Sequence, residues 1–151
     1  MTRTLTPLLA ALILATAPMT YAASQVNTKD GAEVVVEEKV VYHINDYTVA
    51  RVAMRNIENH LNASPGVKIV VVTHGKGIDF LLNNAQDEKG AYEPQVAGLK
   101  NRGVTFDVCR NTLKGRNLDD SAVIMEAQVV PSGVAEIGKL QAKEGYVYLK
   151  P

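Results

Sequence analysis

The chain contains one cysteine, Cys109, which lies in the stretch VTFDVCRNTL at residues 104–113. A single cysteine cannot form a disulfide within the chain, so its thiol either packs as a small apolar group or reacts with another molecule. The residues before Cys109 are typical of a strand, and those after it predict a turn into a helix. Backbone amides at such a turn can face the thiol and favour its anion. We therefore interpret Cys109 as a reactive thiol, with an inert buried thiol as the alternative.

Strands and helices alternate along the chain from Lys39 onward. Short β-type runs are expected at residues 40–44, 67–73, 104–109, 127–130 and 146–149. Helices are expected from Tyr47 to the Pro65-Gly66 stop and over residues 93–102, 118–126 and 134–143, with a turn and a short helix after His74. Strands separated by helices imply right-handed crossovers and parallel pairing. The predicted fold class is α/β: a three-layer α/β/α domain with a mostly parallel five-stranded sheet.

The first predicted helix has both a start signal and an apolar face. Asn45 or Asp46 can cap its amino end. Its apolar residues at helical spacing are Val49, Val52, Ala53, Ile57 and Leu61. We expect this stripe to pack against the sheet.

Polar residues gather where the predicted strands end. In an open parallel sheet, binding sites form beyond the carboxyl ends of the strands. The pocket candidates around Cys109 are therefore His43, Asn45, His74, Gly75, Arg110, Asn111, Thr112, Ser132 and Gly133. Arg110 and Arg116 either add positive charge near the thiol or are solvated surface residues.

His74 lies in the segment THGKG and is a candidate base for Cys109. Gly75 and Gly77 permit tight turns with exposed amides, which can form an anion-binding nest. A purely structural turn with an incidental histidine is the competing interpretation.

Two other chemistries use the same residue types. Cys109, His43 and His74 are possible metal ligands, but the histidines lack the close spacing of a metal motif, so neither a metal nor another cofactor is predicted. Asp46 could orient a histidine in a Cys-His-Asp hydrolase, although the small chain offers no obvious substrate cleft. His60 is expected on the first helix, away from the strand ends.

Residues 1–22 have the layout of a secretory signal peptide. Arg3 precedes an apolar run over residues 8–17, and Thr20-Tyr21-Ala22 forms a small-x-small cleavage site. The run is shorter than the roughly 20 apolar residues that span a bilayer. We expect cleavage before Ala23, a flexible arm over residues 23–38 with a short edge strand at Val34–Val36, a single domain at residues 39–151, and a periplasmic or secreted location.

The charge balance excludes some classes of partner. The chain has 16 basic and 16 acidic residues, and removal of Arg3 with the signal peptide leaves 15 against 16. No basic face is predicted, and the absence of Trp disfavours stacking on bases, so nucleic acid is not an expected partner. No membrane contact is expected after signal cleavage.

The chain resembles the small single-domain branch of the DsrE/DsrF-like (DsrEFH-type) family. The resemblance lies in KVVYHIND at residues 39–46, VVTHGKGIDFLL at 71–82, GVTFDVCRNTLKGR at 103–116 and VVPSGVAEIGKLQAKEGYVYLKP at 129–151. It implies a five-stranded parallel sheet, a homo-oligomer such as a trimer or hexamer, and sulfur carried as a persulfide on the cysteine after the third strand, Cys109. The partners it implies are sulfur donor and acceptor proteins or small thiols.

The leading hypothesis is a periplasmic sulfur-relay protein, a sulfur carrier or sulfurtransferase that uses Cys109. One alternative is a non-catalytic oligomeric module that binds a small anion or nucleotide-like ligand at the strand ends. Another is a thiol-redox or metal-responsive protein.

Overall fold

The computed structural model describes residues 27–29, 32–34 and 37–151, which divide between two compact units, residues 1–36 and 37–151. In the first unit, β1 (Asn27–Lys29) and β2 (Ala32–Val34) form a two-stranded antiparallel hairpin. Val34, the one described residue of the expected edge strand, lies in β2. Residues 35–36 and the expected signal peptide at residues 1–22 lie outside the described residues.

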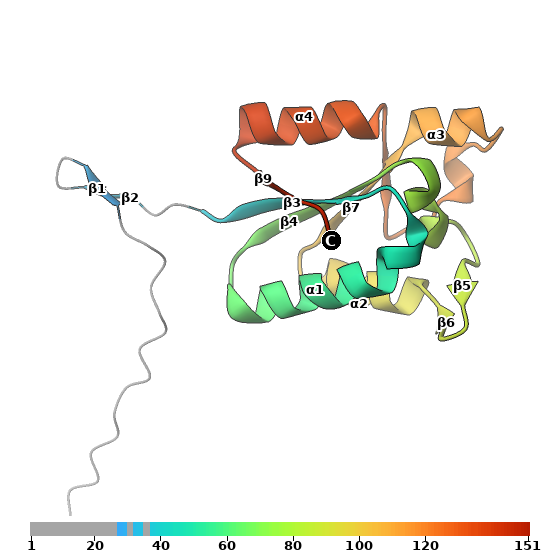
Figure 1. The fold of residues 1–151 in the computed structure, drawn as a ribbon, viewed down its shortest axis with the longest axis horizontal. Helices are drawn as coiled ribbons and strands as arrows, with labels where there is room; N and C mark the ends of the chain where they lie inside the picture. Colours follow the sequence, from blue (N-terminus) through green and yellow to red (C-terminus); the bar gives the residue numbers. More distant parts are fainter. Residues whose placement is uncertain (1–26, 30–31, 35–36) are drawn as a thin grey trace, which may run out of the picture. The chain divides into compact units, whose positions relative to one another are not determined.

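The second unit contains a five-stranded sheet in which every pairing is parallel (Figure 1). The strand order is β8-β7-β4-β3-β9. The bounds are β3 (Lys39–Ile44), β4 (Lys68–Thr73), β7 (Thr105–Cys109), β8 (Gln128–Val130) and β9 (Val147–Leu149). The predicted fold class is confirmed, because parallel neighbours require the helical crossovers that the sequence indicated.

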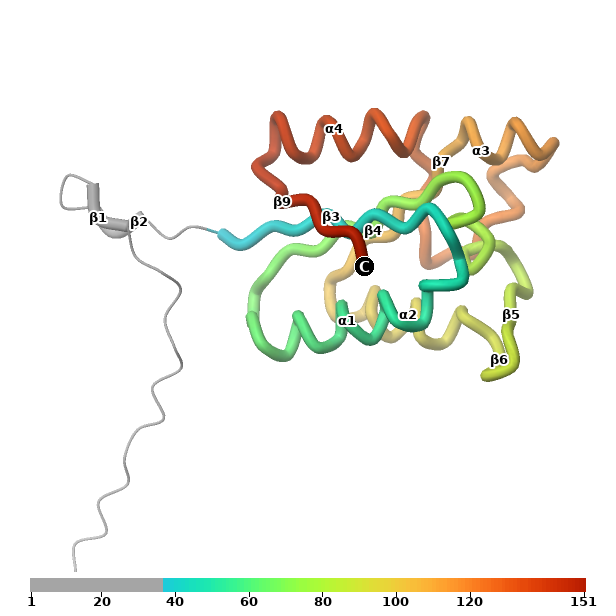
Figure 2. The backbone as a smooth tube through the Cα atoms, in the orientation of Figure 1, coloured from blue at the N-terminus to red at the C-terminus, as the bar shows by residue number. Residues whose placement is uncertain are grey.

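Helices cover both faces of this sheet. Helices α1 (Ala50–Ala63) and α2 (Glu93–Asn101) lie on one face, and α4 (Gly133–Glu144) lies on the other (Figures 1 and 2). The short α3 (Arg110–Gly115) follows β7 directly. Alternate strand residues serve the two faces: Val40, Tyr42 and Ile44 belong to the larger core cluster, whereas Val41 packs with Leu140 of α4. Burial on both faces explains the nearly continuous apolar runs of β3 and β4.

The chain enters α1 through a 3₁₀ turn, η1 (Tyr47–Val49), capped by Asp46. The Asp46 carboxylate accepts a hydrogen bond of 2.9 Å from the Thr48 amide, as the capping prediction required. The predicted stripe is wrong at Val52, which is 44% exposed. The fully buried face is instead Ala50, Ala53, Met54 and Ile57. In the described part of the chain no helix combines the length and apolarity needed to cross a membrane.

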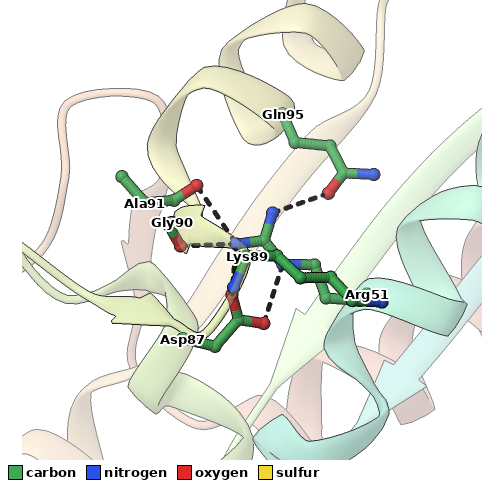
Figure 3. A network of polar contacts seen from close by, with 6 residues as sticks. All are labelled: Arg51, Asp87, Lys89, Gly90, Ala91 and Gln95. Atoms are coloured by element: carbon green, nitrogen blue, oxygen red, sulfur yellow. Dashed lines mark hydrogen bonds and ion pairs between the residues drawn. The ribbon is translucent and has the colours of Figure 1, made fainter.

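Arg51 of α1 fixes the segment that precedes α2 (Figure 3). Its guanidinium donates two hydrogen bonds of 3.0 and 2.9 Å to the Asp87 carboxylate and one of 2.6 Å to the Gly90 carbonyl. These partners belong to the hairpin of β5 (Gln86–Asp87) and β6 (Gly90–Ala91). The Arg51 hydrogen bonds lower the pKa of Asp87 to about 2. The guanidinium also lies 4.1 Å from the centroid of the Tyr92 ring.

The predicted helix over residues 118–126 is wrong, because the segment forms only a 3₁₀ turn, η3 (Asp120–Ala122). Asp119 accepts hydrogen bonds from the amide and the hydroxyl of Ser121, which favours a turn over a continuing helix. The backbone beyond the turn is also engaged elsewhere, since the Ile124 amide donates to the Leu81 carbonyl.

The short helix expected after His74 is the 3₁₀ helix η2 (Gly75–Leu81), which packs against the end of β3 at Gly77. A Cβ atom at Gly77 would lie 2.0 Å from the Ile44 carbonyl oxygen, closer than non-bonded atoms can approach. This position therefore requires glycine for close backbone packing, although its φ is ordinary.

We expect Gly77→Ala to destabilise the domain by about 2 kcal/mol or more, because either η2 or β3 must shift. Urea unfolding followed by circular dichroism measures the change in the free energy of unfolding. Gly98→Ala is the matched control, since Gly98 lies exposed in α2 with no atom within 4 Å of an added Cβ. That control should be neutral or stabilising by up to about 1 kcal/mol. Equal midpoints for the two variants would contradict the packing argument.

Candidate functional site

The carboxyl ends of four strands meet at one edge of the sheet. Ile44 of β3 pairs with Thr73 of β4, Thr73 pairs with Val108 of β7, and Cys109 pairs with Val130 of β8. His74 follows β4 directly, so it stands beside Cys109 in this parallel register. The segments that the sequence assigned to a common edge therefore converge there.

Cys109 lies between the end of β7 and the start of α3, with only 4% of its surface exposed. Burial by itself raises the pKa of the thiol. The amides of Gly133, Thr112 and Asn111 and the Thr112 hydroxyl surround the sulfur and act in the opposite direction, although Cys109 makes no side-chain cap hydrogen bond to the start of α3. The donors prevail, and the pKa of Cys109 lies below its ordinary value. A buried thiol with this many donors is suited to exist as a thiolate.

Gly133, the first residue of α4, lies directly against the strand ends. A Cβ atom at this position would lie 3.1 Å from the Thr73 carbonyl oxygen, 3.2 Å from Cys109 Cβ and 3.3 Å from His74 Cβ. Each of these contacts is tighter than an ordinary packing distance. A glycine here lets an α4 amide reach the Cys109 sulfur, while Ser132 caps the helix through the Ala135 amide at 3.4 Å.

Gly75 and Thr112 connect the segment after β4 to α3. The Gly75 amide donates a 3.1 Å hydrogen bond to Thr112 Oγ1, which leaves the hydroxyl proton available to the Cys109 sulfur. Gly75 has φ +58°, a left-handed conformation that favours glycine. Arg116 donates to the Gly75 carbonyl at 2.8 Å and pairs with Asp79. Asn45 contributes its backbone, whose carbonyl would lie 3.5 Å from a Cβ at Gly75.

His43 and His74 contact each other through their ring nitrogens. The two Nε2 atoms are 2.7 Å apart, and His43 Nδ1 lies 2.7 Å from the Tyr148 hydroxyl. Burial and the neighbouring positive charge of Lys150 lower the pKa of both histidines, and His74 lowers that of His43 further.

Arg110, one of the predicted pocket residues around Cys109, pairs with Asp120. Its guanidinium makes two hydrogen bonds of 3.1 and 2.6 Å to the carboxylate of Asp120. Together with Lys114, Leu118, Asp119 and Ser121, this pair lines an open hollow of about 600 Å³ beside α3, and Cys109 does not line it.

The structure does not bring together the residues of the metal site or of the Cys-His-Asp hydrolase considered from the sequence. Within residues 37–151 and the described hairpin, no cluster of three or more His, Cys, Asp or Glu side chains is arranged to hold a metal. The Asp46 carboxylate binds the Thr48 amide and hydroxyl, so it does not orient a histidine. His60 lies on α1 between Tyr42 and Glu38, at 3.0 and 2.8 Å.

Two residues near the site were not among the sequence candidates. Tyr148 holds His43, and Asp107 lies two residues before Cys109 with 2% of its surface exposed. Burial raises the pKa of Asp107 to about 6, and a 2.7 Å hydrogen bond from Gln128 only partly offsets it. An acid inside the apolar run of β7 was the available signal for Asp107. Tyr148 had no local signal, because its partner is 105 residues away.

We expect Asp107 to make the domain less stable as the pH rises. Its folded-state pKa exceeds the unfolded value, so the folded chain holds the proton more tightly and stability falls from about pH 4 to pH 6. The loss is on the order of 3 kcal/mol. Asp107→Asn should remove most of this slope and stabilise the protein at pH 8 in urea unfolding across pH 4–8. An unchanged slope in this variant would show that other groups cause the pH dependence.

We also expect Thr112→Val to raise the pKa of Cys109, because the variant lacks the hydroxyl that donates to sulfur. Alkylation by iodoacetamide at pH 7 should slow by about threefold or more. Asn111→Ala is the matched control, since Asn111 contributes only its backbone amide and should react at the wild-type rate. Equal slowing of both variants would instead indicate a general disturbance of α3.

Solved structures with this fold include two of similar size. The chain is 29% identical to MTH1491, a protein of unknown function from Methanobacterium thermoautotrophicum, with a TM-score of 0.67 over 76% of this chain and 100% of that one. It is 11% identical to the ychN protein from E. coli, with a TM-score of 0.62 over 77% of this chain and 100% of that one, which supports the fold alone. No curated protein matches the sequence significantly.

The sequence model of the DsrE/DsrF-like family matches residues 34–151, a span that includes the whole parallel sheet and the Cys109 site. This agrees with the resemblance carried by the strand-end segments. The chain therefore belongs to the DsrE/DsrF-like family, which is associated with sulfur relay.

Proposed function

We propose that this protein is a sulfur carrier in which Cys109 accepts a sulfane sulfur atom as a persulfide and passes it to another thiol. The observation that carries the proposal is the position of Cys109: it lies at the N-cap of α3 and against Gly133 of α4, and the polar groups around it lower the pKa of its thiol. A thiolate is the reactive form in sulfur exchange, and the lowered pKa makes it easier to form.

Loading is a nucleophilic displacement at sulfur. The Cys109 thiolate attacks the outer sulfur of a donor R–S–S⁻, a new S–S bond forms on Cys109, and the donor S–S bond breaks to release RS⁻. Cys109 then carries –S–S⁻. In the return step an acceptor thiolate attacks that outer sulfur, and Cys109 leaves as a thiolate. No net oxidant is required, since the sulfane sulfur moves between thiols.

The small exposure of Cys109 restricts the donors that fit. With 4% of the residue exposed and Gly133 packed against its Cβ, the thiol suits a slender donor whose terminal sulfur is unhindered. Small persulfides, thiosulfate, or a cysteine persulfide at the tip of a partner protein meet this requirement. We further propose that the protein acts as a homo-oligomer in the periplasm or outside the cell, on the basis of the family and of residues 1–22.

A non-covalent anion-binding module would also use backbone amides, but its amides would point at the bound anion. Here the amides of Asn111, Thr112 and Gly133 lie around the cysteine sulfur and lower its pKa. That orientation favours a bound thiolate over an exchangeable anion, which would need free amides.

We expect the protein, incubated with thiosulfate or cysteine persulfide, to gain the mass of one or more sulfur atoms in intact-mass spectrometry. The gain should disappear on treatment with dithiothreitol. Cys109→Ser should gain nothing, and Asn111→Ala should load like the wild type.

A reduced Cys109 that is alkylated by iodoacetamide and yet gains no sulfur would contradict the carrier function. A protein of that behaviour whose thermal stability rises with an added anion would support the binding module instead.

A further inference from the structure

Four polar side chains form a row on the face of the sheet that α4 covers. They are Tyr148, His43, His74 and Cys109. Val41 and Val72 pack with Leu140 of α4, and His43 and His74 each lie two residues further along the same segments. Strand residues two apart point to the same face. By the same alternation Tyr148 lies on this face, because Leu149 packs with the opposite cluster.

The row joins Tyr148, His43 and His74 by direct contacts and extends toward Cys109. The Tyr148 hydroxyl contacts His43 Nδ1 at 2.7 Å, and His43 Nε2 contacts His74 Nε2 at 2.7 Å. The Cβ atoms of His74 and Cys109 lie 3.3 and 3.2 Å from the same point, the place of an added Cβ on Gly133. The two side chains are therefore neighbours under the first turn of α4.

The Nε2–Nε2 contact limits how many protons the histidines can hold. A hydrogen bond between two imidazole nitrogens needs one N–H and one lone pair. If both rings were cationic, two N–H groups would face each other at 2.7 Å. The pair therefore exists as a neutral form or as a form with one added proton shared along the bond.

We propose that His43 and His74 act as one proton-holding unit for Cys109, with His74 taking the thiol proton before attack and returning it to the departing thiolate. This role rests on the proposed sulfur-carrier function. It assigns the residues that assist sulfur transfer from alkyl persulfides. Tyr148 is the positioning residue, since its hydroxyl fixes the ring of His43.

The protons balance in the transfer of sulfur from the donor to Cys109. Cys109–SH and R–S–S⁻ react to give Cys109–S–S⁻ and RSH. The thiol proton passes to the histidine pair, the thiolate forms the new S–S bond, and RS⁻ leaves with the electron pair of the broken bond. RS⁻ then takes the same proton from the pair. An alkyl thiolate is a strong base and gains from this proton, whereas sulfite, which leaves from thiosulfate, is a much weaker base.

The charges around the pair favour its neutral, proton-accepting form at rest. Lys150 adds positive charge near both rings, and burial acts in the same direction. The other titratable groups that face this region include Tyr148, Cys109 and Asp107 from the strands and Glu136 and Lys139 from α4, both of which act on Asp107.

The test compares two small donors on one protein. At pH 7, His74→Gln should slow sulfur uptake from cysteine persulfide by about tenfold or more, as expected when a positioned acid–base group is lost. Uptake from thiosulfate should slow by a smaller factor, because the thiol proton must still be removed but the departing sulfite does not need it. Glutamine can keep a hydrogen bond to His43 but cannot release a proton. His43→Gln should reproduce the donor-dependent loss, and His60→Gln, a histidine on α1, should match the wild type.

Each result decides a different point. Equal slowing with both donors would overturn the return of the proton to the departing thiolate, and unchanged rates in both His43→Gln and His74→Gln would overturn the whole proton-holding role. If the wild type takes sulfur from neither donor, the carrier function itself fails. A persulfide-specific loss in both variants, with unchanged melting temperatures, supports the proposal.

Discussion

The close approach of Gly133 to the ends of β4 and β7 is the contact on which the site depends. The first turn of α4 can lie against the Thr73 carbonyl and the Cys109 and His74 side chains only because residue 133 has no Cβ. That approach brings an α4 amide to the cysteine sulfur. It also closes the thiol from solvent to 4% exposure, so one packing contact sets both the electrostatics and the access of the site.

Two acids on the same face of β7 show how local donors decide ionisation in a dry environment. Cys109 and Asp107 are both buried, and burial raises the pKa of each. Cys109 receives donors from α3 and α4, which lower its pKa overall. Asp107 has one side-chain donor, Gln128, and its pKa stays raised to about 6. The larger number of donors around Cys109 accompanies a lowered pKa, whereas deep burial with a single side-chain donor leaves the pKa of Asp107 raised.

The parallel sheet gives this chemistry a linear arrangement. Neighbouring strands end at the same level, and alternate residues share a face, so His43, His74 and Cys109 line up beside Tyr148 under α4. The opposite face carries the larger apolar cluster with α1 and α2. The domain thus separates its main stabilising core from the face that holds the titratable row. Substitutions in the row are for this reason expected to alter reactivity more than folding.

The sequence by itself determined the α/β architecture and the gathering of Cys109, His74, Gly75 and Gly133 at one sheet edge, because strand periodicity and turn residues are local signals. The family followed from the resemblance of the strand-end segments. It misjudged residues 118–126, whose side-chain and backbone hydrogen bonds draw them into a turn, and Val52, which lies off the buried face of α1. Only the tertiary structure joined His43 to Tyr148, turned Arg110 toward Asp120, and placed the Gly133 amide on the thiol. These contacts span long separations or depend on side-chain direction, and no pattern of residue types along the chain encodes either.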